Sequence, residues 1–146
     1  MADPVTILAI LNGGAGLLLK CTGVAKSLKD LVGKQRKAQI TILSLIQELD
    51  TITAAWRRIM VWSEEFDEEV STNSELLQRL DRSLEIGALV ISALEEDISA
   101  YRGGQEPLGF LRRSKVVWNE TLLQDHQNRI RGQIGALSLL LQVLNL

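Results

Sequence analysis

Apolar residues recur every three or four positions along most of this 146-residue chain. That spacing matches the 3.6 residues of an α-helical turn and not the alternation of a β-strand, so the chain is predicted to be all-α. Four segments carry the pattern, at about 3–32, 34–62, 72–101 and 116–146. Because the connections are short, we expect an antiparallel helical bundle of about four long helices. No linker-like stretch divides the chain, so residues 1–146 are expected to form a single domain.

The first segment has a clear start signal. Asp3 is a favourable N-cap residue, and Pro4 suits the first position of a helix. Residues 12–14, Asn-Gly-Gly, are a weak point, because each helical glycine costs about 0.8–1 kcal/mol relative to alanine. Two interpretations follow: one helix spans the whole segment, or the helix kinks or breaks at these residues. The stripe expected to face the core is Ile7, Leu11, Gly14, Leu18, Cys21, Ala25, Leu28 and Val32.

The boundaries of the third helix also have sequence signals. The acidic stretch 63–73 is expected to be a loop that follows the second helix. Thr72 and Glu75 have the spacing of a capping box, which predicts where the third helix begins. The pair Gly103-Gly104 predicts that this helix ends near Tyr101.

The composition argues against catalytic chemistry. One cysteine and one histidine cannot supply an internal disulfide or a Cys/His metal site. Cys21 falls on an apolar stripe and is expected to be a small buried side chain. The net charge of −2 provides no basic field for nucleic acid. We therefore predict that the protein is not an enzyme. We expect no catalytic or metal-binding residues, no cofactor, no small-molecule substrate and no nucleic-acid partner.

The first helix contains an uncharged run from Pro4 to Leu19. This run is shorter than the roughly 18–20 residues that span a bilayer. A helix that is apolar on all sides is buried either in a protein core or in a membrane. The run is therefore interpreted either as the central element of the bundle or as a segment that inserts conditionally into a membrane. The candidates for insertion are Val5, Ile7, Leu8, Ile10, Leu11, Leu17, Leu18 and Leu19.

Charge is distributed unevenly along the chain. Residues 1–40 carry a net charge of +4, residues 41–100 carry −9, and residues 101–146 carry +3. One interpretation is that basic and acidic helices pack beside each other. The other is that a basic end contacts anionic lipid or an acidic partner, with Lys20, Lys26 and Lys29 as the candidate residues for lipid.

Three further residues are candidates for a protein interface. Trp62 and Trp118 are large aromatic residues of the kind that anchor interfaces, although core packing is the alternative for each. His126 falls on the apolar stripe of the fourth segment and is expected to pack in the core or at an interface.

Four stretches together carry a family resemblance. They are the opening Met1-Ala2-Asp3-Pro4-Val5, residues 43–49, residues 117–120, and residues 130–137 leading into the leucines at 139–141. With them the chain resembles the fungal N-terminal domain that precedes STAND-type NTPases and ankyrin-repeat proteins, in the group of HeLo-like helical domains. The chain departs from that architecture because it contains no NTPase and no repeats.

The resemblance implies a signalling role. It implies an effector domain of an NLR-like receptor that releases its N-terminal helix, here residues 5–19, and perturbs the plasma membrane. This activity leads to programmed cell death in non-self recognition, including heterokaryon incompatibility. The expected protein is cytoplasmic and is recruited to the plasma membrane. Its expected partners are an anionic membrane and either itself or another helical domain. The alternative is a helical interaction or oligomerisation module of a receptor or scaffold, with no membrane activity.

Overall fold

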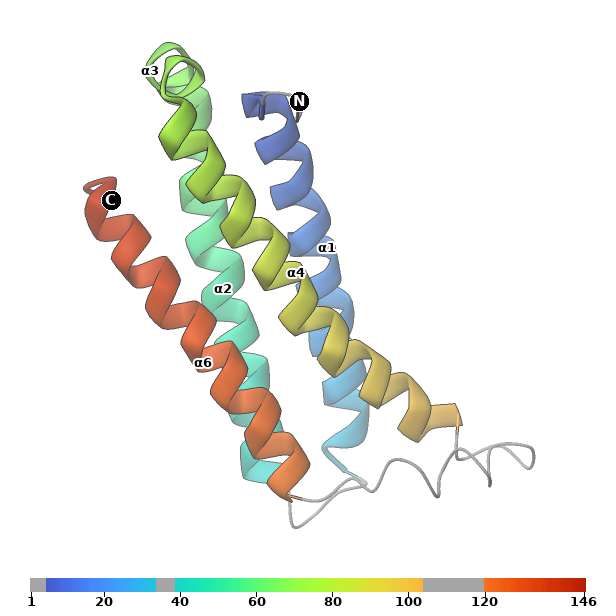
Figure 1. The fold of residues 1–146 in the computed structure, drawn as a ribbon. Helices are drawn as coiled ribbons and strands as arrows, with labels where there is room; N and C mark the ends of the chain where they lie inside the picture. Colours follow the sequence, from blue (N-terminus) through green and yellow to red (C-terminus); the bar gives the residue numbers. More distant parts are fainter. Residues whose placement is uncertain (1–4, 34–38, 104–119) are drawn as a thin grey trace.

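The computed structural model describes residues 5–33, 39–103 and 120–146, and every regular element in these ranges is helical (Figure 1). The all-α prediction is confirmed. The helices are α1 (Ile7–Leu31), α2 (Gln39–Glu65), α3 (Asp67–Thr72), α4 (Ser74–Gly103) and α6 (Glu120–Val143). The predicted starts of the second helix, at residue 34, and of the fourth helix, at residue 116, lie outside the described residues. The third helix ends close to the predicted position.

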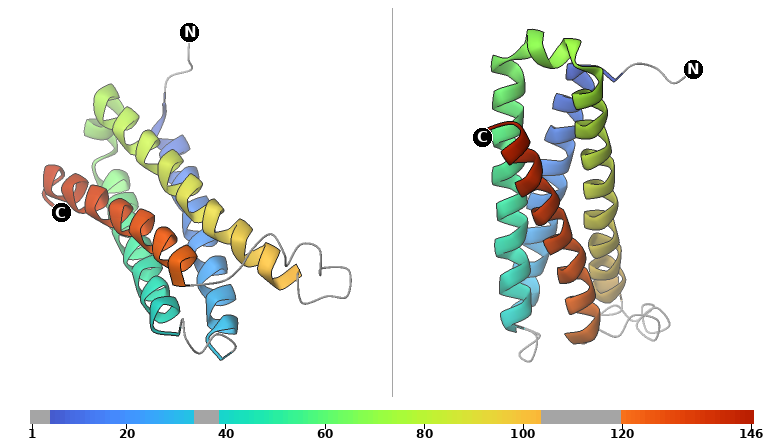
Figure 2. Two further views of the ribbon diagram at one scale, coloured as in Figure 1. Left: turned by 60° about the horizontal axis from the view of Figure 1, so that its bottom comes forward. Right: turned by 60° about the vertical axis from the view of Figure 1, so that its left-hand side comes forward.

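The four long helices form a bundle in which α1 and α6 occupy opposite positions. Helix α1 packs against α2 and α4, whereas α6 packs mainly against α2 and less extensively against α4. In the right-hand view of Figure 2, α6 runs from beside the lower end of α4 toward α2. The carboxyl half of α6 therefore has fewer neighbours on its α4 side than its amino half has.

The core is a continuous cluster of aliphatic side chains together with Trp56. Helix α1 supplies the buried residues Ile10, Leu17, Val24 and Leu31, each two turns from the next. The stripe predicted for the first helix contains Gly14, Cys21, Ala25 and Leu28, which are also buried, but it does not contain this row. Almost every position in the first half of α1 is apolar, so hydrophobicity alone did not specify the whole face that packs against α2 and α4.

Helix α1 also begins later than the sequence predicted. Residues 5 and 6 precede the helix, and Thr6 is its N-cap, with its Oγ1 accepting a hydrogen bond of 3.1 Å from the Ala9 N–H. The predicted cap, Asp3, lies outside the described residues. The side-chain oxygen of a threonine accepts a hydrogen bond from an unpaired N–H group of the first turn, as an aspartate oxygen would.

Of the two interpretations of residues 12–14, the structure has the continuous helix, since α1 runs without a break from Ile7 to Leu31. A Cβ atom placed on Gly14 would lie 2.7 Å from the Met60 Sδ of α2. One placed on Gly13 would lie 3.1 Å from a Leu84 methyl carbon of α4. The two glycines thus let α1 approach both neighbours closely, and the packing offsets their low helix propensity.

The acidic stretch 63–73, predicted to be a loop, is mostly helical. Helix α2 continues to Glu65, and α3 occupies residues 67–72. Buried Val70 fixes α3 against the core and explains why this charged segment is ordered. The predicted capping box is also wrong. The Asn73 Oδ1 accepts from the Leu76 N–H at 3.1 Å, while the Thr72 hydroxyl donates back into α3 to the Glu68 carbonyl.

Candidate docking groove and the amino-terminal helix

The single histidine takes part in a polar contact between two helices. His126 on α6 is 2% exposed, and its Nε2 lies 2.6 Å from Asp97 Oδ2 on α4. The histidine therefore points into the bundle and is not on the surface as an interface anchor. Among the described residues, no group of three or more His, Cys, Asp or Glu side chains could hold a metal ion.

The thiol of Cys21 is buried in the core. Burial raises its pKa from 9.0 to about 11, and a hydrogen bond with Thr53 offsets part of that shift. A thiol with this pKa stays protonated at neutral pH, so it is a weak nucleophile. Its position matches the small hydrophobic side chain that the stripe predicted.

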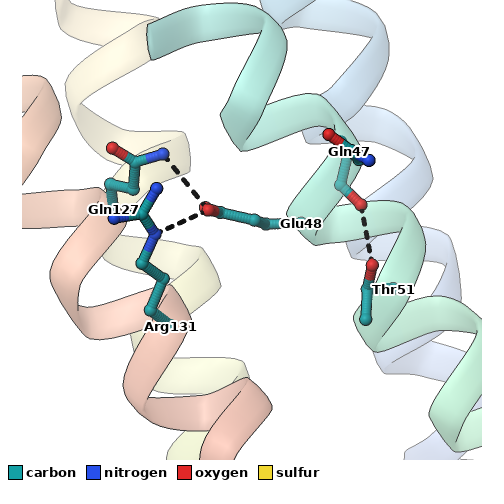
Figure 3. A network of polar contacts seen from close by, with 5 residues as sticks. All are labelled: Gln47, Glu48, Thr51, Gln127 and Arg131. Atoms are coloured by element: carbon teal, nitrogen blue, oxygen red, sulfur yellow. Dashed lines mark hydrogen bonds and ion pairs between the residues drawn. The ribbon is translucent and has the colours of Figure 1, made fainter.

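A second polar contact joins α6 to α2 (Figure 3). Glu48 reaches from α2 toward α6, where its Oε1 accepts hydrogen bonds from Gln127 Nε2 at 3.2 Å and Arg131 Nε at 2.8 Å. His126, which contacts Asp97 on α4, lies in the same half of α6 as Gln127 and Arg131. Polar contacts to two different helices therefore fix the amino half of α6 in place.

Exposed large apolar side chains gather along the other half of α6 and on the helices that face it. Leu139 and Val143 of α6 are 65% and 63% exposed, and Ile86 of α4 is 43% exposed. Val61 in the last turns of α2 and Phe66, which directly follows that helix, are exposed as well. Isolated exposed hydrophobic residues are common on soluble proteins, but a contiguous set marks a binding surface.

A groove separates α4 from this half of α6, and we call it the α4/α6 groove. It has a volume of about 330 Å³. Its walls are Arg79, Arg82, Ser83 and Ile86 from α4, and Gln133, Ala136, Leu139, Leu140 and Val143 from α6. Positions on each wall recur at helical spacing, so each helix presents one continuous face to the groove over two turns or more.

A second hollow, which we call the Trp62 pocket, opens at the end of α2. It has a volume of about 650 Å³ and includes Val61, Trp62, Phe66, Leu144 and Leu146. The Trp62 and Phe66 rings pack at a centroid distance of 5.9 Å. A third hollow, which shares Trp62 and Leu144 with this pocket and Arg79 and Val143 with the α4/α6 groove, connects the two. The three hollows therefore adjoin one another from α4 to the end of α2, but Glu69, Asn73 and Glu75 also line the connecting one.

The eight insertion candidates of the first helix fall into three groups. Ile10 and Leu17 are buried, and Leu8 and Leu19 are 63% and 76% exposed. The remaining four are half-buried: Val5, Ile7, Leu11 and Leu18. One face of α1 is thus packed in the core, while an uncharged face is open to solvent.

The three lysine candidates do not share one environment. Lys20 is half-buried and donates a hydrogen bond from its Nζ to Ser92 Oγ on α4. Lys26 and Lys29 are exposed near the carboxyl end of α1. Of the aromatic interface candidates, Trp62 is half-buried and lines the pocket named after it, and Trp118 lies outside the described residues.

Sequence reasoning missed Ile86, Leu139 and Val143, which form much of the α4/α6 groove. A signal for two of them was present in the run 137–144, Leu-Ser-Leu-Leu-Leu-Gln-Val-Leu. Six of these eight residues are apolar, more than one core-facing stripe needs, so some must point away from the core.

Helix α1 is long and apolar enough to cross a bilayer, judged by length and composition alone. The core helix of a soluble protein can meet the same criteria, and 28% of the best 18-residue window in α1 is buried in the bundle. Comparison with protein-family models, with curated proteins and with solved structures finds no match for this chain. The resemblance to fungal STAND N-terminal domains stays a prediction.

Proposed function

We propose that this protein is a non-enzymatic helical interaction domain that binds a helix of a partner protein in the α4/α6 groove. The observation that carries the proposal is the pairing of exposed apolar side chains across the groove. Ile86 lies on the α4 wall, and Leu139 and Val143 lie on the α6 wall. Apolar contact area removed from water contributes roughly 25 cal/mol per Å², so covering these side chains favours binding.

The dimensions of the groove favour a helical partner. Both walls are helices, and the α6 wall from Gln133 to Val143 extends about 15 Å at 1.5 Å per residue. A partner helix lying between them would pack its side chains into the spaces between those of α4 and α6, as helices do inside a bundle. An amphipathic helix in a hydrophobic groove is a recurrent mode of peptide recognition.

The proposed scaffold for this groove is an antiparallel bundle of about four long helices. In that arrangement α6 is held by the contacts of His126 with Asp97 and of Glu48 with Gln127 and Arg131. Those contacts leave residues 133–143 without an equivalent polar tie among the described residues.

The second candidate function is the membrane effector activity implied by the family resemblance. The observation in its favour is the open, uncharged face of α1 that contains Leu8 and Leu19. Insertion of residues 5–19 would withdraw Ile10 and Leu17 from the core. These side chains would move into lipid, but the apolar surfaces of α2 and α4 that α1 covers would be left facing water, which is unfavourable. Insertion therefore requires a trigger that opens the bundle.

One pair of variants tests both functions. Leu139→Glu changes the groove, and Leu19→Glu makes the same substitution on the open face of α1, where the side chain is similarly exposed. The probes are a designed amphipathic helical peptide, labelled for fluorescence anisotropy, and vesicles that contain phosphatidylserine. We expect Leu139→Glu alone to lose peptide binding. If the peptide binds neither the wild type nor the control, or binds all three chains equally, the groove has no binding function.

Binding to the vesicles tests the second candidate function, membrane effector activity. Sedimentation of the wild type with vesicles, lost in Leu19→Glu and kept in Leu139→Glu, would assign the function to α1 and the membrane. Circular dichroism of each variant checks that the bundle remains folded. Because both leucines are mostly exposed in the wild type, we expect neither substitution to unfold the protein.

A further inference from the structure

This inference rests on the proposed function and concerns the chemistry of the partner helix. The α4/α6 groove has charged residues on one wall only. Arg79 and Arg82 lie on the α4 wall, the α6 wall is uncharged, and no Asp or Glu lines this groove. The charge that a bound helix meets therefore depends on which of its edges faces α4.

The two arginines differ in their local partners. Arg79 Nη2 lies 2.7 Å from Glu75 Oε1, in an exposed pair one turn apart on α4. Such a pair contributes little and exchanges partners easily. Arg82 makes no ion pair within the part of the chain that the structure describes. Its guanidinium group is free to bind a carboxylate from outside, and the planar fork of arginine suits both carboxylate oxygens at once.

The opposite wall has space for bulky side chains. Ala136, which lines the groove, is small and exposed. Gly132 and Gly135 beside it on α6 do not line the groove, but they are exposed too, and Cβ atoms placed on them would meet nothing within 4 Å. A partner helix can therefore approach α6 closely with large apolar residues. Leu139 and Val143 extend beyond this small-residue stretch and would pack against the partner.

We propose that the α4/α6 groove selects an amphipathic protein helix with acidic residues along the edge that faces α4. The apolar face of that helix packs against Ile86, Ala136, Leu139 and Val143. Its acidic edge contacts Arg82 first and Arg79 second. The arginines set selectivity and orientation, while the apolar contacts supply most of the affinity.

The test uses three designed helical peptides of about fourteen residues, which is about 21 Å of helix and longer than the groove. The peptides share one leucine face and carry glutamate, glutamine or lysine along one edge. Binding to the full chain is measured by fluorescence anisotropy at low and at high salt. We expect the glutamate peptide to bind about three- to tenfold more tightly than the lysine peptide, which is the range for one or two exposed charge pairs. High salt should reduce that ratio.

Charge reversal on the protein gives the decisive comparison. Arg82→Glu should invert the preference between the glutamate and lysine peptides, and Arg82→Gln should reduce it. Lys26→Glu makes a similar change of charge on α1, away from the groove, and should leave the preference unchanged. All of these positions are exposed, and circular dichroism checks the fold.

Three other results overturn the inference in different ways. Equal binding of the three peptides, with loss of binding in Leu139→Glu, would keep the groove as a helix-binding site and remove the charge selection. Absence of binding by every peptide would overturn the proposed function as well. A wild-type chain that forms a dimer in sedimentation, and that Leu139→Glu makes monomeric, would show that a second copy covers the groove in place of a different partner.

Discussion

The carboxylate of Asp97 on α4 accepts a hydrogen bond from Nε2 of His126 on α6, at 2.6 Å, and the imidazole ring is almost completely buried. This contact lies between helices that pack less extensively than α1 does with either of its neighbours. It thereby helps to fix the position of α6, and with it one wall of the groove that we propose as a binding site.

Substitution of His126 should destabilise the bundle more than substitution of its partner. His126→Ala removes a buried ring and leaves a cavity, so we expect the free energy of unfolding to fall by about 2–3 kcal/mol. Asp97→Asn keeps a hydrogen-bonding oxygen and should cost about 1 kcal/mol. Urea unfolding measures both, with the exposed neighbour Glu96→Gln as the control. Equal stability of His126→Ala and the wild type would show that this contact does not secure α6.

The glycines of α1 should respond to alanine in different ways. Gly16→Ala adds a methyl group where nothing lies within 4 Å, so the gain in helix propensity should stabilise the protein by about 0.5–1 kcal/mol. Gly14→Ala places its Cβ against the Met60 side chain, which must move. We expect this variant to be at least about 1 kcal/mol less stable than Gly16→Ala. Thermal unfolding compares the two, and equal midpoints would mean that α1 and α2 do not approach closely at Gly14.

The core and solvent faces of α1 should differ sharply in their tolerance of truncation. Ile10→Ala leaves a cavity in the core and should cost about 2–5 kcal/mol. Leu8→Ala lies on the open face and should change stability by less than about 0.5 kcal/mol. Denaturant unfolding of both variants provides the comparison. Similar losses from the two variants would contradict the orientation of α1 in the bundle.

The Cys21 thiol should make stability depend on pH only in alkaline solution. The unfolded thiol loses its proton near the pKa of 9.0, whereas the folded one keeps it to a pKa of about 11. Unfolding between these pH values therefore releases a proton, so the contribution of Cys21 is constant below pH 9.0 and decreases from there to about pH 11. Because other groups also titrate in this range, the measurement is the difference in unfolding free energy between the wild type and Cys21→Ala across the range. A difference that does not change with pH would contradict the raised pKa.

The cap of α4 distinguishes the observed helix start from the one that the sequence suggested. Asn73→Ala removes the oxygen that accepts from the Leu76 N–H and should cost about 1 kcal/mol. Thr72→Ala removes a hydroxyl that bonds only within α3 and should cost less. The two variants are compared by thermal unfolding. A larger loss in Thr72→Ala would restore the predicted capping box.

The sequence alone determined the helical class of this protein, because the period of its apolar residues excludes strands. The same period places Leu45, Leu49 and Trp56 of α2 on one apolar stripe with polar residues on either side, and all three are buried. In α1 the same reasoning found part of the buried face, Gly14, Cys21, Ala25 and Leu28, but missed Ile10, Leu17, Val24 and Leu31. It missed Ile10 and Leu17 because apolar residues surround the helix in its first half. Only the packing of α1 between α2 and α4 decided that Ile10 and Leu17 are buried while Leu8 and Leu19 are exposed.

Tertiary structure also decided where the candidate site lies. Ile86 belongs to α4, and Leu139 and Val143 belong to α6, so no spacing in the sequence relates them. They line one groove because α6 packs mainly against α2 and leaves its carboxyl half partly uncovered toward α4. Local periodicity specifies which residues share a face of one helix. The arrangement of neighbouring helices then determines which of those faces remains open to a partner.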